Sequence, residues 1–216
     1  GGKRQKLYPI LENHELERIY HNYELTKDDD ERARRNWFRS NQLRKSRNKV
    51  IISLMIYQGL TTAEVNKMQV NDLKLKEGKI LIRGGRKSNE RLLELKANQI
   101  IDLMEYQSET RPELLQHYKE STNYLFISNP VAGRKYNTSE TIVNTWKLLS
   151  EEIRENNSDF INFKQVRSSV ITHWLKEYNL RNVQYMAGHR YVSSTEKYLA
   201  NQTEDLQADI DLFHPF

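Results

Sequence analysis

The sequence predicts a mostly helical domain with a small antiparallel sheet of three strands, and two patterns lead to this prediction. Apolar residues recur at helical spacing through most of the chain. Between residues 73 and 95 the pattern changes to three alternating runs, at 73–76, 80–83 and 92–95, with turn residues at 77–78 and 84–89 between them. Short alternating runs joined by tight turns are typical of antiparallel strands. No internal repeat or interior linker is visible, so we expect one domain over residues 1–216.

Composition restricts the class of protein. A chain of 216 residues can bury a core, but only 37% of its residues are hydrophobic and its mean hydropathy is -0.84. The core must therefore come from amphipathic helices with charged outer faces. Cysteine is absent, which excludes a disulfide scaffold, thiolate zinc sites and thiol catalysis, and no apolar run could span a membrane. We expect a cytoplasmic protein, and Gly1-Gly2 to be a cloning remnant or the cut edge of a longer chain.

The balance of charge favours a polyanionic partner. The formal net charge is +5 and the isoelectric point is near 9.2. Eight basic residues fall between 32 and 49 and interleave with Trp37, Phe38 and Leu43. Such a run is often only a solvated helix face. Because this one carries a single sign, we expect part of it to contact a phosphate backbone; the candidates are Arg44, Lys45 and Arg47.

The first half of the chain carries two helix signals before the strands. Helical spacing over 7–25 includes Leu11, Leu16 and Ile19, and the run 50–57 is apolar nearly all round, as a central buried helix would be. Gly59 falls where a left-handed C-terminal cap belongs. Thr61 and Glu64 then form a capping box that starts a new helix.

The second half adds helices over 97–106 and 138–153 and then a third, whose first residues carry charge. Asn162 and Gln165 form a plausible capping box for this third helix. Lys164 and Arg167 are three apart in its first turns, where free N–H groups and the helix dipole favour an anion. The pattern outlines a phosphate site, although the two side chains could equally be exposed on a surface helix.

The stretch 187–198 is the most informative part of the chain. A Gly188-His189 pair closes one helix, and Ser193 with Glu196 reads as a capping box for another helix with Tyr198 in its second turn. This arrangement holds a tyrosine hydroxyl near a histidine. A tyrosine that acts as a nucleophile must be surrounded by positive charge, because its pKa is near ten. Alternatively, Tyr198 is one of 12 tyrosines and packs with its hydroxyl at the surface.

Five motifs occur in one order along the chain. They are an apolar helix ending in Gly59-Leu60-Thr61-Thr62-Ala63-Glu64, a hairpin over 83–95, Lys164-Gln165-Val166-Arg167, Ala187-Gly188-His189, and Tyr198 nine residues beyond the histidine. On these motifs the chain resembles the catalytic domain of the tyrosine recombinases, the phage integrase family, from about Leu7 to Pro215. The tail Leu212-Phe213-His214-Pro215 resembles the His-Pro ending common in that family.

The resemblance implies a site-specific DNA recombinase or integrase, of a mobile element or phage, that needs no metal or other cofactor. Tyr198 would attack a DNA phosphodiester, form a 3′-phosphotyrosyl link and release a 5′-hydroxyl, while cationic side chains neutralise the developing charge. Arg167 would clamp the non-bridging oxygens, and Lys164 and His189 would add donors. A lysine of the hairpin serves as general acid in the family. Lys87 is our choice, although counting back from Arg91 allows Arg86.

Two positions depart from the family pattern. Lys164 stands in the usual histidine slot, a milder change that keeps a cation, and the larger change is at Thr61. Relatives place their first catalytic arginine where this chain has Thr61, and losing one oriented donor costs about 2.7 to 4 kcal/mol of barrier. Another cation could swing into the gap; the candidates are Arg83, Arg86, Arg181 and Arg190. Alternatively, the chain is a DNA-binding architectural or regulatory domain without strand cleavage. A helical protein-interaction module would leave the five ordered motifs unexplained.

The resemblance also implies partners. Double-stranded DNA is expected, with Arg86 and Arg190 as further contacts, and nucleoid association would follow. Full-length relatives carry an N-terminal helical domain that the 216 residues do not include. Relatives also exchange a C-terminal helix between subunits on DNA, and Leu206, Ile210, Leu212 and Phe213 form an apolar stripe suited to this. The same stripe could instead fold back on its own domain.

Overall fold

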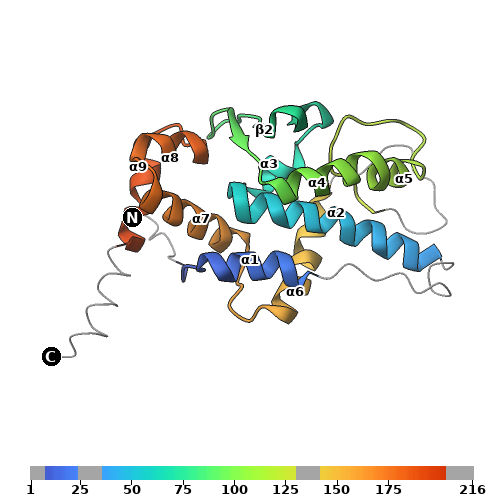
Figure 1. Cartoon of the computed structure of the whole chain (residues 1–216), viewed down its shortest axis with the longest axis horizontal. Coiled ribbons are helices and arrows are strands. Elements are labelled where there is room, and N and C mark those ends of the chain that lie inside the picture. The colour runs from blue at the N-terminus through green and yellow to red at the C-terminus, as the bar shows by residue number, and fades with distance from the viewer. Residues whose placement is uncertain (1–7, 24–35, 130–141, 203–216) are drawn as a thin grey trace.

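The computed structural model describes residues 8–23, 36–129 and 142–202, and it confirms a mostly helical fold with one small sheet (Figure 1). The α-helices are α1 (Asn13–Asn22), α2 (Asn36–Gln58), α3 (Thr62–Asn66), α4 (Ala97–Glu105), α5 (Arg111–Leu115), α6 (Thr145–Asn156), α7 (Phe163–Glu177), α8 (Leu180–Ala187) and α9 (Val192–Glu196). The strands are β1 (Leu73–Lys74), β2 (Lys79–Ile82) and β3 (Arg91–Glu94). Short 3₁₀ turns cover Val70–Asp72, Leu75–Glu77 and Ile142–Asn144, and a π-helical turn over Tyr106–Thr110 joins α4 to α5.

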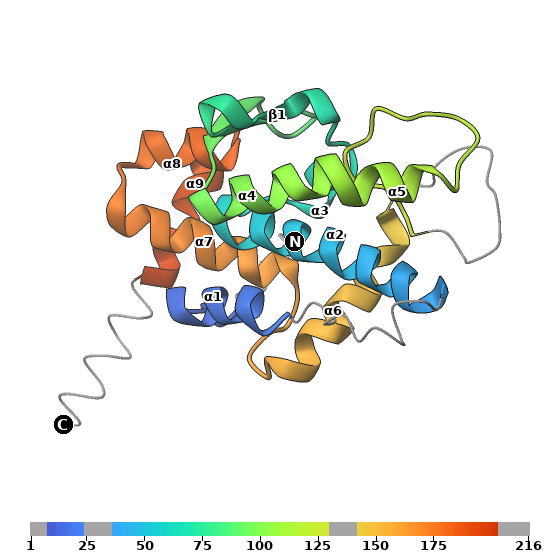
Figure 2. The ribbon, with the colours of Figure 1, turned by 45° about the vertical axis from the view of Figure 1, so that its right-hand side comes forward.

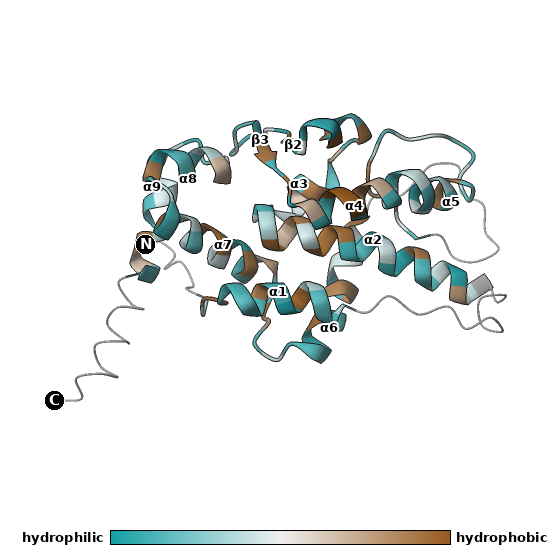
Figure 3. Ribbon diagram, in the orientation of Figure 1, coloured by the Kyte–Doolittle hydropathy of each residue, from teal (hydrophilic) through white to brown (hydrophobic). Residues whose placement is uncertain are grey.

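Helix α2 is the centre of the fold. Figures 1 and 2 show it passing through the middle of the molecule, with α1 and α6 on one side and α4, α5 and the sheet on the other. Its C-terminal half is apolar, as Figure 3 shows, and Ile51, Ile52 and Leu54 there are fully buried. The described part of the basic run, from residue 36, and the apolar run therefore belong to one helix of 23 residues.

The signals at the end of α2 have the predicted geometry. Gly59 has φ +60°, a left-handed conformation that ends the helix without a side-chain penalty. The Thr61 hydroxyl accepts from the Glu64 amide at 3.2 Å, and the Thr61 amide donates to the Glu64 carboxylate at 3.0 Å. The capping box is confirmed, and α3 begins directly after it.

The sheet has the order β1-β2-β3 and is antiparallel throughout, as predicted. Gly78, with φ +64°, makes the first turn. The second connection closes tightly, because the Gly85 amide donates to the Ser88 carbonyl at 2.9 Å. The intervening residues, Arg86 and Lys87, are left exposed at the tip of the hairpin.

The C-terminal segments differ in one respect from the prediction. Gly188 ends α8 with φ +71°, as expected, but Tyr191 and not Ser193 precedes the first turn of α9. The helix ends at Glu196, so Tyr198 lies in the turn that follows it and not in its second turn. The predicted capping box is wrong because the Ser194 amide donates to the Tyr191 carbonyl at 3.1 Å, which starts the helix earlier.

The predicted tail stripe lies outside the described residues, as does the beginning of the predicted helix over 138–153. Within the described ranges, no helix is both long enough and apolar enough to cross a membrane.

Candidate active site

Arg167 is held at the centre of the site by backbone carbonyls. Its position in the second turn of α7 follows from the helix start at Asn162, whose side chain accepts from the Gln165 amide at 2.9 Å. The guanidinium donates to the Gly59 carbonyl at 2.7 Å and to the Ala187 carbonyl at 2.9 Å. Burial lowers the pKa of Arg167, which is opposed by the nearby charges of Glu64 and Tyr198, and an arginine stays protonated at neutral pH regardless.

His189 and Tyr198 lie beside this guanidinium. His189 Nε2 is 3.4 Å from an Arg167 nitrogen, and His189 Nδ1 is 2.8 Å from the Thr195 hydroxyl. Burial, followed by the charges of Arg167 and Arg91, lowers the pKa of His189 to about 4, so the ring is neutral at pH 7. Because Arg167 can only donate, the network assigns the ring proton to Nδ1, which donates to Thr195.

The hairpin is attached to the same turn. Ser88 pairs with His189 in an isolated antiparallel bridge, and the Asn89 amide donates to the Gly188 carbonyl at 2.9 Å. Arg190 donates to the Gly85 carbonyl at 3.2 Å on the other side of the tip. These three contacts hold the hairpin tip beside the histidine.

The tip itself carries both candidates for the hairpin cation. Arg86 and Lys87 are exposed, and no described residue forms an ion pair with either side chain. Neither is directed by a contact towards Tyr198, so the choice between them stays a prediction.

A buried ion pair, Arg91 with Glu64, packs against the turn at Gly188 and His189. Arg91 and Glu64 are 2% and 5% exposed, and their charged atoms are 2.7 Å apart. Burial alone would raise the pKa of Glu64, but the hydrogen bond and charge of Arg91 lower it below its usual value. Arg91 also donates to the Met186 carbonyl at 2.8 Å and packs under Gly188. The pair thus connects the capping box of α3, the hairpin and the end of α8.

Lys164 lies at one side of this centre. It is exposed, and it lines a pocket that also includes Thr61 and Arg167. The structure therefore brings Lys164, Arg167, His189 and Tyr198 to one region, and within the described residues no group of His, Asp and Glu could hold a metal ion.

The basic run of α2 does not form a common surface. Arg47 is 1% exposed and donates to the Ile127 carbonyl at 2.8 Å and to the Asn48 side chain. Its assignment as a DNA contact is therefore corrected: the guanidinium serves the interior, and burial lowers its pKa to about 10. The physical reason is that α2 runs through the core, so part of its basic N-terminal half faces inward.

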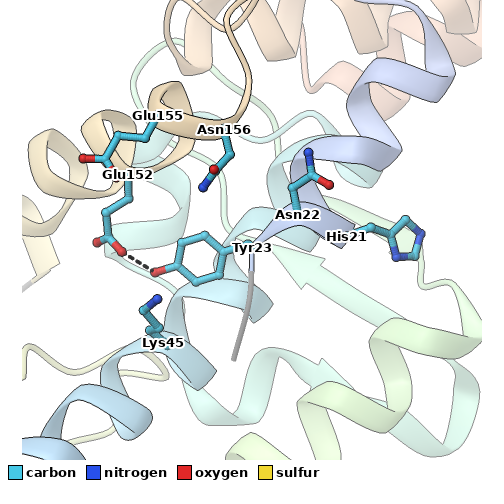
Figure 4. Close-up of a pocket in the computed structure, with 7 residues that line it drawn as sticks. All are labelled: His21, Asn22, Tyr23, Lys45, Glu152, Glu155 and Asn156. Atoms are coloured by element: carbon cyan, nitrogen blue, oxygen red, sulfur yellow. Dashed lines mark hydrogen bonds between the residues drawn. The ribbon is translucent and has the colours of Figure 1, made fainter. Parts of the chain in front are cut away.

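Lys45 lines a polar pocket between α1, α2 and α6, together with Glu152 (Figure 4). Arg44 pairs with Glu152, which also accepts from the Tyr23 hydroxyl at 3.2 Å. The Lys45 ammonium lies 5.7 Å from the centre of the Tyr23 ring. Arg44 is thus engaged by a carboxylate, and the contact of these two residues with DNA stays a prediction.

Sequence reasoning missed three residues of the site. They are Thr195, which contacts His189, and the ion pair of Arg91 with Glu64. All three residues are buried, and no local pattern in the sequence predicts their contacts. Only the position of Thr195 between His189 and Tyr198 offered a signal.

Comparisons with known proteins agree with this geometry. Tyrosine recombinase XerD of Staphylococcus haemolyticus is 29% identical to the chain over 171 residues, which are 78% of the chain and 55% of that protein. Tyrosine recombinase XerA of Pyrococcus furiosus is 22% identical over 168 residues, 77% of the chain and 54% of that protein. The chain thus spans about half the length of the curated relatives it matches.

Solved structures share the fold. A crystal structure of XerH site-specific recombinase bound to its palindromic difH substrate after cleavage superposes with a TM-score of 0.68 at 21% identity; the match covers 96% of this chain and 54% of that one. A crystal structure of XerA recombinase gives 0.64 at 19% identity, covering 100% and 67%.

The sequence pattern of the phage integrase family matches residues 10–205, which include every motif from α2 to Tyr198. The chain belongs to the phage integrase family.

Proposed function

We propose that this chain is the catalytic domain of a site-specific DNA recombinase or integrase, and that Tyr198 is its nucleophile. One observation carries the proposal: the Tyr198 phenol stacks on His189, a neutral histidine whose Nε2 lies 3.4 Å from the guanidinium of Arg167 on α7. Membership of the family supports the same reaction class. Double-stranded DNA and further recombinase subunits are the proposed partners, and a mobile element or phage is the proposed origin.

The proposed chemistry uses the residues as follows. The Tyr198 oxygen attacks the phosphorus, a 3′-phosphotyrosyl bond forms, and the bond from phosphorus to the 5′ oxygen breaks. Arg167 stabilises the charge that develops on the non-bridging oxygens, with Lys164 as a second cation. His189 is neutral; for its Nε2 to accept the phenolic proton, the stacked phenol must turn so that the Tyr198 hydroxyl replaces Arg167 at that nitrogen. The hairpin cation, for which Lys87 is our choice and Arg86 the alternative, donates a proton to the leaving oxygen, which departs as a 5′-hydroxyl; an arginine would be a poor acid for this step.

The first experiment asks whether a covalent intermediate forms. The protein is incubated with a pool of nicked suicide duplexes of randomised sequence, in which the released 5′ fragment diffuses away and traps the adduct. We expect a band of covalent protein–DNA complex on a denaturing gel with the wild type, and none with Tyr198→Phe, which should still bind the duplexes.

One observation favours a second candidate function, that of a DNA-binding domain without cleavage. By the resemblance to the family, Thr61 takes the place of the first catalytic arginine; in the structure both its hydroxyl and its amide are used to cap α3. If the wild type binds the duplexes and forms no adduct, this second function replaces the first.

A further inference from the structure

The pocket beside Arg167 is lined by three cationic side chains and, among the described residues, by no carboxylate. Its polar lining consists of Tyr8, Thr61, Thr62, Lys147, Ser150, Asn162, Lys164 and Arg167, and its apolar lining of Met55, Leu60, Trp146 and Phe163. The three cations come from the first turn of α6 and the first two turns of α7. Because α7 begins at this pocket, its helix dipole adds to the positive potential there.

Lys147 is the lining residue for which the sequence and the family motifs give no role. It follows Trp146, whose indole N–H donates to the Asn66 side chain at 2.8 Å. The Trp146 ring also packs edge-on against Phe163, with 5.2 Å between ring centres. Trp146 thus ties the start of α6 to the end of α3 and the start of α7, which holds the next residue at the pocket.

No carboxylate of the described residues neutralises the two lysines of this pocket. Arg44, Arg83 and Arg91 each pair with a carboxylate elsewhere in the fold. By contrast, neither Lys147 nor Lys164 has an ion pair or hydrogen bond through its ammonium with any described residue. Two exposed lysines and Arg167 therefore line one pocket without a described carboxylate, and a phosphate is an anion that such cations can bind.

We infer that Lys147 binds the phosphate that is cleaved and supplies the charge that is missing at Thr61. The inference rests on the proposed function. Thr61 lines the same pocket as Lys147, so an ammonium from α6 reaches the region that a side chain at position 61 would occupy.

The other candidates for this role are engaged elsewhere. Arg83 holds Asp72 with two bonds of 2.9 and 3.0 Å, Arg190 donates to Gly85, and Arg181 donates to Gln184 on α8. Arg86 is at the hairpin tip and does not line the pocket. Lys147 is therefore the cation, among those considered, that already lies beside Thr61.

The first test measures single-turnover cleavage of the nicked duplexes at saturating protein. Lys147→Ala should slow cleavage by about a hundredfold to a thousandfold, the range for one oriented donor. Lys119→Ala removes an equally exposed lysine beyond α5 and should leave the rate unchanged. Alanine is a good helix former and Lys147 is exposed, so the variant should fold. Equal rates for wild type and Lys147→Ala would overturn the inference.

A double-mutant cycle then tests whether Lys147 takes the place of an arginine at position 61. Thr61→Arg should leave the wild-type rate level or lower it, because the new guanidinium crowds Lys147. In the Lys147→Ala background the same change should raise the rate about tenfold or more. An equal effect of Thr61→Arg in both backgrounds would show that Lys147 does not fill the gap.

The experiments distinguish a failure of the proposed function from a failure of the inference about Lys147. If the wild type forms no adduct, the inference is judged by binding to the same duplexes at several salt concentrations. Loss of one phosphate contact should reduce the slope of log affinity against log salt by about 0.9 for Lys147→Ala and not for Lys119→Ala. An unchanged slope would then reject Lys147 as a phosphate ligand as well.

Discussion

The imidazole of His189 stacks on the phenol ring of Tyr198, with 5.9 Å between the ring centres and 12° between the planes. On its other side the imidazole is fixed by the hydrogen bond with Thr195. The histidine is thus held from two directions next to the tyrosine, although nine residues of chain separate them.

Thr195 should act as a positioning residue for this ring. Thr195→Val keeps the volume but removes the Nδ1 partner of His189, so we expect cleavage of the suicide duplex to slow by about tenfold while DNA affinity is unchanged. Thr195→Ser restores a hydroxyl and should recover most of the rate. A serine variant as slow as the valine variant would show that Thr195 acts only through packing.

The depressed pKa of His189 predicts a pH dependence of folding. The folded value is about 4 and the ordinary value is 6.5, so the unfolded chain binds more protons between these limits. Stability is therefore complete above about pH 6.5 and falls as the pH is lowered towards 4. Urea unfolding should give a loss on the order of 1 kcal/mol between pH 7 and pH 5, allowing for the partial exposure of the ring.

The control for that prediction is His189→Gln, which cannot titrate. Its stability should change less over the same interval than that of the wild type. The same slope in both proteins would assign the effect to other groups.

Gly188 should tolerate no side chain. A Cβ there would lie 2.4 Å from a nitrogen of the buried Arg91 and would also require the left-handed conformation of φ +71°. Gly78→Ala is the matched control, because its φ is +64° and the nearest atom is an Ile100 methyl group at 3.5 Å. We expect Gly78→Ala to cost about 1–2 kcal/mol and Gly188→Ala at least 1 kcal/mol more, roughly the cost of overpacking.

Thermal or urea unfolding of the two alanine variants compares these costs directly. Equal losses would mean that Arg91 moves aside without penalty, and that the close packing under Gly188 does not fix the turn.

The hydroxyl of Thr61 should contribute to the stability of α3. Thr61→Ala removes the acceptor for the Glu64 amide, and we expect a loss of about 0.5 to 2 kcal/mol in urea unfolding. Thr61→Ser keeps the acceptor and should lose little. A stable alanine variant would indicate that the Glu64 half of the capping box is sufficient.

The parts of the fold that the sequence predicts best are those with local causes. The left-handed turns at Gly59, Gly78 and Gly188 and the caps at Thr61 and Asn162 depend on neighbouring residues, and each is present. The predicted start of α9 at Ser193 was wrong, although serine is a good N-cap residue. Tyr191 takes the extended conformation of the N-cap, so the helix begins earlier.

The site is predicted less completely, because its contacts join distant segments. The family motifs indicate Arg167, His189 and Tyr198 by spacing, but not that Arg91 from the hairpin lies beneath Gly188. Arg47 looked like its basic neighbours in sequence, and only the path of α2 through the core explains its burial. Lys147 lies in the pocket because of Trp146, a contact between α6 and α3 that no short motif encodes.

The central claim is that Tyr198 forms the covalent link to DNA, and peptide mapping of the trapped adduct by mass spectrometry tests it most directly. After digestion with protease and nuclease, the residual nucleotide should be found on Tyr198, and Tyr198→Phe should yield no adduct. Tyr185 and Tyr191 are the matched alternatives, since both are exposed within the same stretch of chain. A nucleotide on either of them, or an adduct that persists in Tyr198→Phe, would contradict the assignment.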